Sequence, residues 1–392
     1  MRIGVDTCCW GNKRGFGRFT RELLQALIAF DRSNEYVFFV DSKTGDLDEI
    51  PSEVRTIVVN TKYSQVQAAA ADGRRSLGDV WAMSREVMKH QFDVFFFPAV
   101  YSYFPILNRT KIVLTIHDLI ADHHPELVFP NAKTKCFWKL KQRMAVRQAD
   151  LIATVSEYSR KEIASYFQLP ASRLRIISEA ARPVFRVVPK NNGYVSALDK
   201  YGLSAEEQFL LYVGGISPHK NLGKLVHAFK IIVDADLLGS LKLVIVGDYK
   251  DDPFFSAYPD LKRQISDLGL DDKVFFTGFV PDAELTYLYN AATLLVFPSL
   301  EEGFGLPAIE AMACGTPVAA SKTGSLPEVL GLAGRYFDPE NVDEMAAVVS
   351  KILADEPLRN QMKADGLKRS KIAGWERSAG DTLAIFREFD EH

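Results

Sequence analysis

Long hydrophobic runs are absent from the sequence: no stretch approaches the roughly 18 uninterrupted apolar residues of a membrane-spanning helix. Cysteine is scarce, and the four cysteines do not have the spacing of a metal site (Cys8, Cys9, Cys136 and Cys314). Adjacent cysteines rarely pair, and the first residues do not resemble a secretory signal. We therefore expect reduced thiols in a cytoplasmic protein.

Cofactor and metal motifs are missing as well. A dinucleotide-binding fingerprint needs a third glycine where this chain has Thr20 after Gly15 and Gly17. The spacing of His117, His123 and His124 does not match a zinc motif. The sequence therefore predicts neither a metal ion nor a bound cofactor.

The chain's 392 residues exceed the usual size of one core, which predicts two domains. The net charge of -3 hides an asymmetry. Residues 1–190 carry 28 Lys and Arg against 20 Asp and Glu, and the remainder carries 19 against 30. Such a division indicates that the two halves bind different partners.

Short apolar segments alternate with longer helical patterns, as in parallel sheets covered by helices. We expect strands at residues 2–6, 36–40, 54–59, 93–98, 111–116 and 151–155, and again at 209–215, 241–248, 273–278, 293–299 and 316–321. The fold class is therefore α/β, with two doubly wound domains in tandem and a cleft between them. We place the domains at 1–187 and 207–374, joined by a polar linker at 188–206.

Ligands of open α/β sheets bind at the carboxyl ends of the strands, so the loops that follow the strands are of interest. Gly15 and Gly17 open a helix whose free N–H groups suit an anion, although a plain tight turn explains them equally well. His117 follows a strand beside Asp118, a position that favours chemistry over a structural role.

The segment "SPHKN" opens the first helix of the second half. Pro218 and Asn221 favour a helix start, and His219 and Lys220 bring donors to the same end. A lysine there opposes the helix macrodipole. A bound anion such as a diphosphate therefore explains Lys220 better than solvation does.

Glu302 and Glu310 lie in the segment "SLEEGFGLPAIEAMACG" at 299–315, with seven residues between them. Its glycines let the backbone approach a ligand, and the helix that starts at Pro307 offers N–H groups to phosphate. Glu302 and Glu310 would repel such an anion unless they bind hydroxyl groups. The segment therefore indicates a nucleotide-sugar site, with a sugar for one carboxylate and a ribose for the other.

Glu302 and Glu310 within "EEGFGLPAIEAMACGTPV", with "HKN" upstream and "GSLPEV" downstream, resemble the family 4 retaining glycosyltransferases of the GT-B fold. The likeness covers nearly the whole chain. It implies two Rossmann-like domains that face a central cleft, with the donor in the second, the acceptor in the first, and a tail at 375–392 that packs back on the first domain.

The resemblance also implies roles for individual residues. Glu310 would bind the ribose, Glu302 would lie near the transferred sugar, and Lys220 would neutralise the diphosphate. His117 would reach the sugar. The remaining donor-binding positions would be the glycine loop, the helix start, the "EEGFGL" backbone and the base-reading loop (Gly15, Gly17, Gly215, His219, Gly303, Phe304, Gly305, Leu306 and Val280).

One position departs from the family pattern. Many members carry an arginine where this chain has Gly215, and an arginine occupies the position of His219 in some others. The resemblance therefore implies weaker or more pH-dependent diphosphate binding, with His219 supplying part of the missing donor capacity.

The predicted function is a retaining, metal-independent hexosyltransferase of cell-surface polysaccharide synthesis. It would use a UDP- or GDP-sugar and a glycan or polyprenyl-diphosphate-linked acceptor, with no nucleic-acid partner. A nucleotide-sugar 2-epimerase shares the architecture but has no reason to carry the Glu302 loop. A non-catalytic nucleotide-sugar-binding module is a second alternative, supported only by Gly215.

The segment 131–150 predicts a helix with basic residues beside an apolar stripe (Phe137, Trp138, Leu140 and Met144). Ordinary core packing with a solvated basic side explains this pattern about equally well. Because the segment lies in the expected acceptor domain, we predict that Lys139, Lys141 and Arg143 contact an anionic membrane at the inner side of the plasma membrane.

Overall fold

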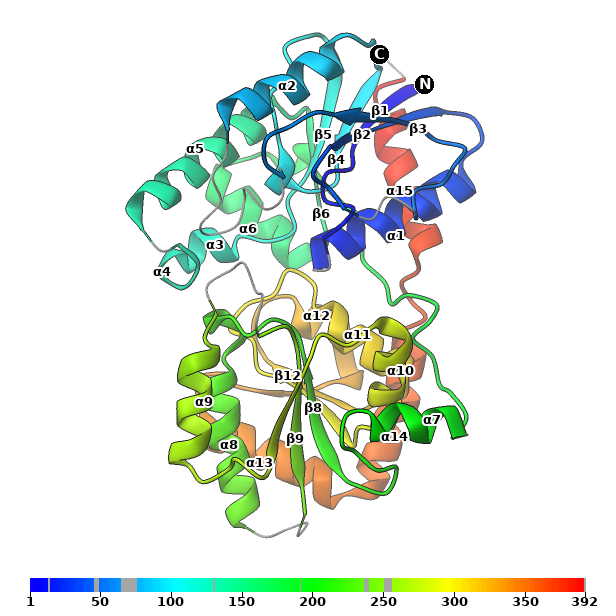
Figure 1. The fold of residues 1–392 in the computed structure, drawn as a ribbon. Coiled ribbons are helices and arrows are strands. Elements are labelled where there is room, and N and C mark those ends of the chain that lie inside the picture. Colours follow the sequence, from blue (N-terminus) through cyan, green and yellow to red (C-terminus); the bar gives the residue numbers. More distant parts are fainter. Residues whose placement is uncertain are drawn as a thin grey trace. The chain divides into compact units, whose positions relative to one another are not determined.

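The computed structural model describes residues 1–12, 15–45, 49–64, 76–129, 131–190, 192–235, 240–249 and 256–390. The chain forms two compact units (Figure 1). The first unit holds Met1–Glu179 and Gly374–His392, and the second holds Ala180–Ala373. The last two residues of the predicted tail lie outside the described residues. None of the described helices is long and apolar enough to cross a membrane.

The first unit is built on a parallel sheet whose seven described strands have the order β3-β2-β1-β4-β5-β6-β7. Most residues of these strands are buried and apolar because helices cover both sides of the sheet. The strands are β1 (Arg2–Asp6), β2 (Glu35–Asp41), β3 (Arg55–Val59), β4 (Val94–Phe97), β5 (Lys111–Thr115), β6 (Leu151–Thr154) and β7 (Leu174–Ile176).

The helices of the first unit follow the strands in alternation, with α1 and α15 side by side on one side of the sheet and α2 and α5 on the other (Figure 1). Asn131 begins α5 by accepting a hydrogen bond from the N–H of Thr134. The helices are α1 (Gly15–Phe30), α2 (Leu77–Met88), η2 (Val100–Ser102), α3 (Ile120–His123), α4 (Pro125–Val128), α5 (Ala132–Gln148), α6 (Glu157–Phe167), η3 (Ala171–Arg173) and α15 (Trp375–Arg387), where η marks a 3₁₀ turn.

The second unit repeats this plan with six described strands in the order β10-β9-β8-β11-β12-β13. Its strands are β8 (Phe209–Val213), β9 (Lys242–Val246), β10 (Val274–Gly278), β11 (Leu294–Phe297), β12 (Val318–Ser321) and β13 (Arg335–Phe337). Its helices are α7 (Asn192–Asp199), η4 (Pro218–Lys220), α8 (Leu222–Asp234), α9 (Tyr258–Asp267), α10 (Asp282–Ala291), α11 (Leu306–Ala313), α12 (Leu326–Leu330), η5 (Gly331–Ala333), α13 (Val342–Ala354) and α14 (Glu356–Arg369).

The linker predicted at 188–206 is wrong. Residues of this segment form α7, which packs on α10, and Tyr194 is buried with its ring 6.0 Å from that of Tyr287. The second unit also begins earlier than predicted, at Ala180, because Arg182 pairs with Asp282 at 2.7 Å. Polar composition suggested a linker, but the few apolar residues of the segment are enough to hold it on the second unit.

Each sheet has a topological switch point, which is the place where the strand order reverses direction. In the first unit this point lies between β1 and β4, and in the second between β8 and β11. The loops that leave two such strands diverge to opposite sides of the sheet, which opens a crevice for ligands at their carboxyl ends. The segments after β8 and β11 carry Lys220 and Glu302, the two charges predicted for the donor site.

Candidate functional site

Lys220 and Glu302 meet in an ion pair at the switch point of the second sheet. The Lys220 Nζ atom donates a hydrogen bond to Glu302 Oε1 over 2.6 Å. The two side chains are only 18% and 10% exposed, so water screens the pair weakly. The sequence placed both residues in one site, but it did not predict that they would bind each other.

The turn that carries Lys220 is fixed at both ends. Its own N–H donates to the carbonyl of Ser217, and the N–H of Leu300 donates to the carbonyl of His219, both over 2.9 Å. Asn221 immediately precedes α8, as predicted, but it adopts a left-handed backbone conformation with φ 60° and its side chain does not cap the helix. Its side-chain amide instead donates to the carbonyls of Pro298 and Pro339, tying η4 to two strand-end loops.

The loop that carries Glu302 is held by the segment "TGSLPEV" after β12. The carbonyl of Glu302 accepts hydrogen bonds from both the N–H and the hydroxyl of Ser325, over 3.2 and 3.0 Å. Gly324 adopts φ 64°, and a Cβ atom there would lie 2.9 Å from the Glu302 nitrogen. A side chain at 324 would therefore displace the backbone of Glu302.

Gly305 and Glu310 shape the helix that follows. Gly305 adopts φ 96° at the start of α11, and a Cβ atom would lie 2.7 Å from Leu326. Only glycine suits that position. Glu310 is 1% exposed, and the hydroxyl of Tyr289 donates to its Oε2 over 3.0 Å. Tyr289 lies on α10, and nothing in the sequence connects it to Glu310.

The other predicted donor-site positions in the second unit lie in the segments after β8, β10 and β11. Phe304, Leu306 and Val280 turn their side chains into the interior of the unit. The carbonyl of Gly215 accepts a hydrogen bond from the hydroxyl of Tyr212 over 2.8 Å. Burial, and secondarily the charge of Glu302, raise the pKa of Tyr212, so this hydroxyl remains a donor. Gly303 lies between Glu302 and Phe304 in the same loop.

His117 is buried at the end of β5 in the first unit. Its Nε2 atom lies 3.0 Å from the carbonyl oxygen of Pro98, which can only accept, so Nε2 carries a proton. Its Nδ1 atom lies 3.4 Å from Glu179 Oε1, and its ring packs edge-on against Phe19. These contacts fix the ring orientation. Sequence reasoning missed Glu179 because it follows a different strand, more than 60 residues away.

The predicted glycine loop has a structural reason of its own. Gly17 lies in the first turn of α1, and a Cβ atom there would come within 2.1 Å of the Asn12 carbonyl oxygen. Arg21 of the same helix donates to that oxygen over 2.8 Å. Gly15 has open space around its Cα. Gly17 is therefore needed for packing inside the unit, whatever else it does.

The predicted basic surface of α5 needs one correction. Lys141 is only 7% exposed; it donates to the carbonyl of Tyr101 and lies 5.1 Å from the ring of Trp138. It belongs to the interior and is not a membrane contact, because its position on α5 turns inward with Trp138. Lys139 is half-buried and Arg143 is exposed.

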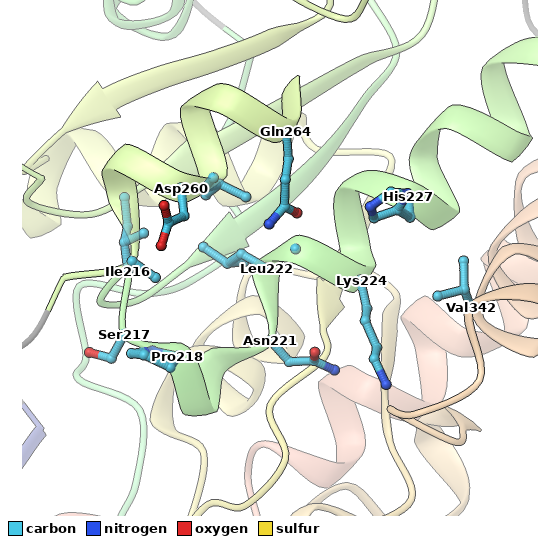
Figure 2. A pocket seen from close by; sticks show the side chains of 13 residues that line it. Ile216, Ser217, Pro218, Asn221, Leu222, Lys224, His227, Asp260, Gln264 and Val342 are labelled. Carbon is cyan, nitrogen blue, oxygen red and sulfur yellow. The ribbon is translucent and has the colours of Figure 1, made fainter. Parts of the chain in front are cut away.

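A pocket of about 580 Å³ lies between α8 and α9, beside the turn that carries Lys220 (Figure 2). It is lined by Ser217 and Asn221 from that turn but not by Lys220 or Glu302. Gln264 points from α9 toward α8, where its Oε1 atom would lie 2.8 Å from a Cβ atom at Gly223. Among the described residues, no cluster of His, Cys, Asp and Glu could hold a metal ion.

Comparison with known proteins decides the family. Residues 13–180 match the family described as "Glycosyltransferase Family 4", and residues 197–369 match "Glycosyl transferases group 1". The O-antigen chain mannosyltransferase B of Escherichia coli is 33% identical over 279 residues, which is 71% of this chain and 70% of that protein. The chain belongs to glycosyltransferase family 4.

Other relatives of this family 4 glycosyltransferase are longer. The serotype-specific mannosyltransferase WbdA of Escherichia coli is 33% identical over 271 residues, covering 69% of this chain but 32% of that protein. The match therefore spans about a third of the length of WbdA.

Solved structures confirm the GT-B fold. The sucrose-phosphate synthase of Thermosynechococcus elongatus superposes with a TM-score of 0.76 at 20% identity, covering 100% of this chain and 99% of that one. Anabaena HepE in complex with UDP and glucose gives a TM-score of 0.74, also at 20% identity, over 98% and 99% of the two chains. At such identity the likeness establishes the fold and not the substrate.

Proposed function

We propose that this glycosyltransferase moves a hexose from a UDP- or GDP-sugar to a glycan or lipid-linked acceptor in cell-surface polysaccharide synthesis. The observation that carries the proposal is the Lys220–Glu302 pair at the carboxyl ends of β8 and β11. It puts a cation for a diphosphate and an acceptor for sugar hydroxyls at one point, a few residues before the buried Glu310.

The proposed roles follow from these positions. Lys220 and the N–H groups at the start of α11 stabilise the charge that develops on the leaving diphosphate. Glu302 orients the sugar, Glu310 holds the ribose, and His117 contacts the sugar as the family resemblance implies. The acceptor attacks on the side from which the diphosphate leaves, so the anomeric configuration is retained. No metal ion takes part in this scheme.

Mannose is the first sugar to test. Its support comes from the names of two relatives at 33% identity, both of which are mannosyltransferases. Structural neighbours were solved with UDP, glucose or UDP-glucose, so both bases belong in the experiment.

Labelled GDP-mannose and UDP-glucose, each with and without a membrane extract that supplies acceptors, test the function. We expect label to enter a lipid or glycan fraction with one donor only, in the presence of EDTA, and with retained configuration by NMR. Formation of a C2 epimer without acceptor would instead identify the epimerase. Donor binding with no turnover under any condition would identify the non-catalytic module.

We also propose that the exposed side of α5 binds the anionic membrane that holds a lipid-linked acceptor. Phe137, Leu140 and Met144 are 45%, 57% and 46% exposed along this helix. The helix contains no acidic residue, and its basic side chains outside the interior flank these three (Lys133, Lys135, Lys139, Arg143 and Arg147). Apolar side chains within a basic surface suit anionic headgroups, at about 1 kcal/mol for each basic residue.

Co-sedimentation with phosphatidylglycerol and phosphatidylcholine vesicles tests this surface. The wild-type chain should bind the anionic vesicles alone, and less at high salt. Lys139→Gln with Arg143→Gln should weaken binding about tenfold or more. A control that removes the exposed Lys161 on α6 should bind like the wild type. Equal binding to both vesicles, or no effect of the α5 changes, would favour a soluble acceptor.

A further inference from the structure

Glu302 already neutralises Lys220, which is the cation that a diphosphate would bind. The Nζ and Oε1 atoms are 2.6 Å apart, and both backbones are fixed by their neighbours. Lys220 lies in a turn closed by Ser217, and the Glu302 carbonyl is held twice by Ser325. The two side chains therefore pair without ordering any flexible segment, so the pair is present before a ligand arrives.

This ion pair should weaken the binding of a nucleoside diphosphate that carries no sugar. To reach Lys220 it must displace the Glu302 carboxylate, and it leaves that carboxylate close to a second anion. Because the side chains are only 18% and 10% exposed, water compensates poorly for the lost partner. Glu302 and the diphosphate thus compete for one cation.

A sugar-bearing nucleotide changes this balance. Its hydroxyl groups donate hydrogen bonds to the Glu302 carboxylate, which loses Lys220 but gains new partners. We propose that Glu302 is a specificity-determining residue that makes the site favour the sugar donor over the nucleoside diphosphate left after transfer. The inference rests on the proposed function and adds to it a mechanism for product release.

Calorimetry on the full chain measures the effect, with UDP, GDP and the matching sugar nucleotides as probes. Glu302→Gln keeps the shape of the side chain and removes its charge. It should bind the free diphosphate about tenfold more tightly than the wild type does, while the sugar nucleotide gains no affinity. The ratio of the two affinities should therefore fall by the same factor, and the free diphosphate should become the stronger inhibitor.

Glu340→Gln is the matched control. Glu340 pairs with Lys224, which lies four residues after Lys220. This variant therefore removes the same charge from the same unit but breaks a more exposed ion pair, whose side chains are 33% and 66% exposed. Its ratio of sugar-nucleotide affinity to free-diphosphate affinity should equal that of the wild type. An equal change in both variants would attribute the effect to net charge and would overturn the inference.

A double variant decides whether Glu302 acts through Lys220. When Lys220 is already alanine, Glu302→Gln should no longer tighten diphosphate binding. Glu302→Asp, which keeps the charge on a shorter side chain, should fall between wild type and Glu302→Gln.

The failures of the inference and of the proposed function are distinguishable. Unchanged or weaker diphosphate binding by a folded Glu302→Gln, with normal binding by the wild type, overturns the inference alone. If the wild-type chain binds neither UDP nor GDP, the proposed function and the inference fail together.

Discussion

The two sheets have the same kind of switch point but close it with different chemistry. In the first unit, Asp6 at the end of β1 is 1% exposed and accepts hydrogen bonds from the hydroxyl of Ser102 and the N–H of Cys8. Burial raises the pKa of Asp6. In the second unit, the corresponding loops hold the Lys220–Glu302 ion pair, which retains some exposure.

The difference indicates which unit is built for an anion. At the first switch point, the buried carboxyl of Asp6 is satisfied by hydrogen bonds from within the unit and is unfavourable beside a phosphate. The second holds a cation whose partner can be exchanged for a ligand. Two basic side chains near the first switch point are already paired: Lys141 with the carbonyl of Tyr101 and the ring of Trp138, and Arg21 with the carbonyl of Asn12. Fold topology alone would not have separated the two sites.

The largest expected effect is the loss of activity when Lys220 is removed from the second switch point. Lys220→Ala should lower kcat/KM by about 1.5–3 kcal/mol, equivalent to roughly 10- to 150-fold, because it removes a charge-assisted contact to phosphate. Lys224→Ala, which removes a more exposed lysine of the same helix segment, is the control. Equal losses in both variants would remove Lys220 from the site.

The next largest effect is a loss of stability when the close packing at Gly17 in the first unit is disturbed. Gly17→Ala should destabilise the protein by about 1–3 kcal/mol, since its Cβ would collide with the carbonyl of Asn12. Gly15→Ala, two residues earlier on the same helix, meets no atom and should be nearly neutral. Urea unfolding measures both. Equal stability of the two variants would show that this loop is held less tightly than the structure indicates.

The buried lysine offers a third comparison. Lys141→Met should cost about 1–2 kcal/mol of stability because the carbonyl of Tyr101 loses its donor inside the unit. Lys139→Met, on the same helix but half-buried, should cost less than about 0.5 kcal/mol. If Lys139 proves the more costly of the two, the interior assignment of Lys141 is wrong.

The smallest effect concerns pH. Because burial raises the pKa of Asp6, the folded state binds its proton more tightly than the unfolded state does. The stability from this group is therefore present below the unfolded pKa and is lost as pH rises through the folded pKa. Asp6→Asn should gain stability relative to wild type as pH rises from below the ordinary pKa of a carboxyl group to neutrality. A constant difference across that range would contradict the assignment.

Much of the fold was predictable from the sequence because buried parallel strands are apolar throughout. The first strand was predicted at its observed bounds, 2–6. The strands β7 and β13 were missed: each has three residues and lies at a sheet edge, too short for a recognisable pattern. The helix α7 was mistaken for linker because its polar composition outweighed the buried Tyr194.

For the candidate site, the sequence suggested which charged residues to expect there but not which of them form pairs. Local motifs pointed to Lys220, Glu302 and Glu310, which lie on η4, on the loop after β11 and on α11. The contacts of Glu310 with Tyr289 and of His117 with Glu179 join distant segments, so no local spacing could reveal them. Lys141 was misassigned because helical spacing alone does not say which side of α5 meets the core.

Hydrogen exchange with and without UDP or GDP tests most directly whether the second switch point holds the nucleotide. We predict the strongest protection at residues 214–222 and 299–310, since binding stabilises the segments that contact the ligand. Residues 6–10 and 99–104, at the first switch point, should change much less. Protection confined to those first-unit segments, with none around Lys220 and Glu302, would contradict the account.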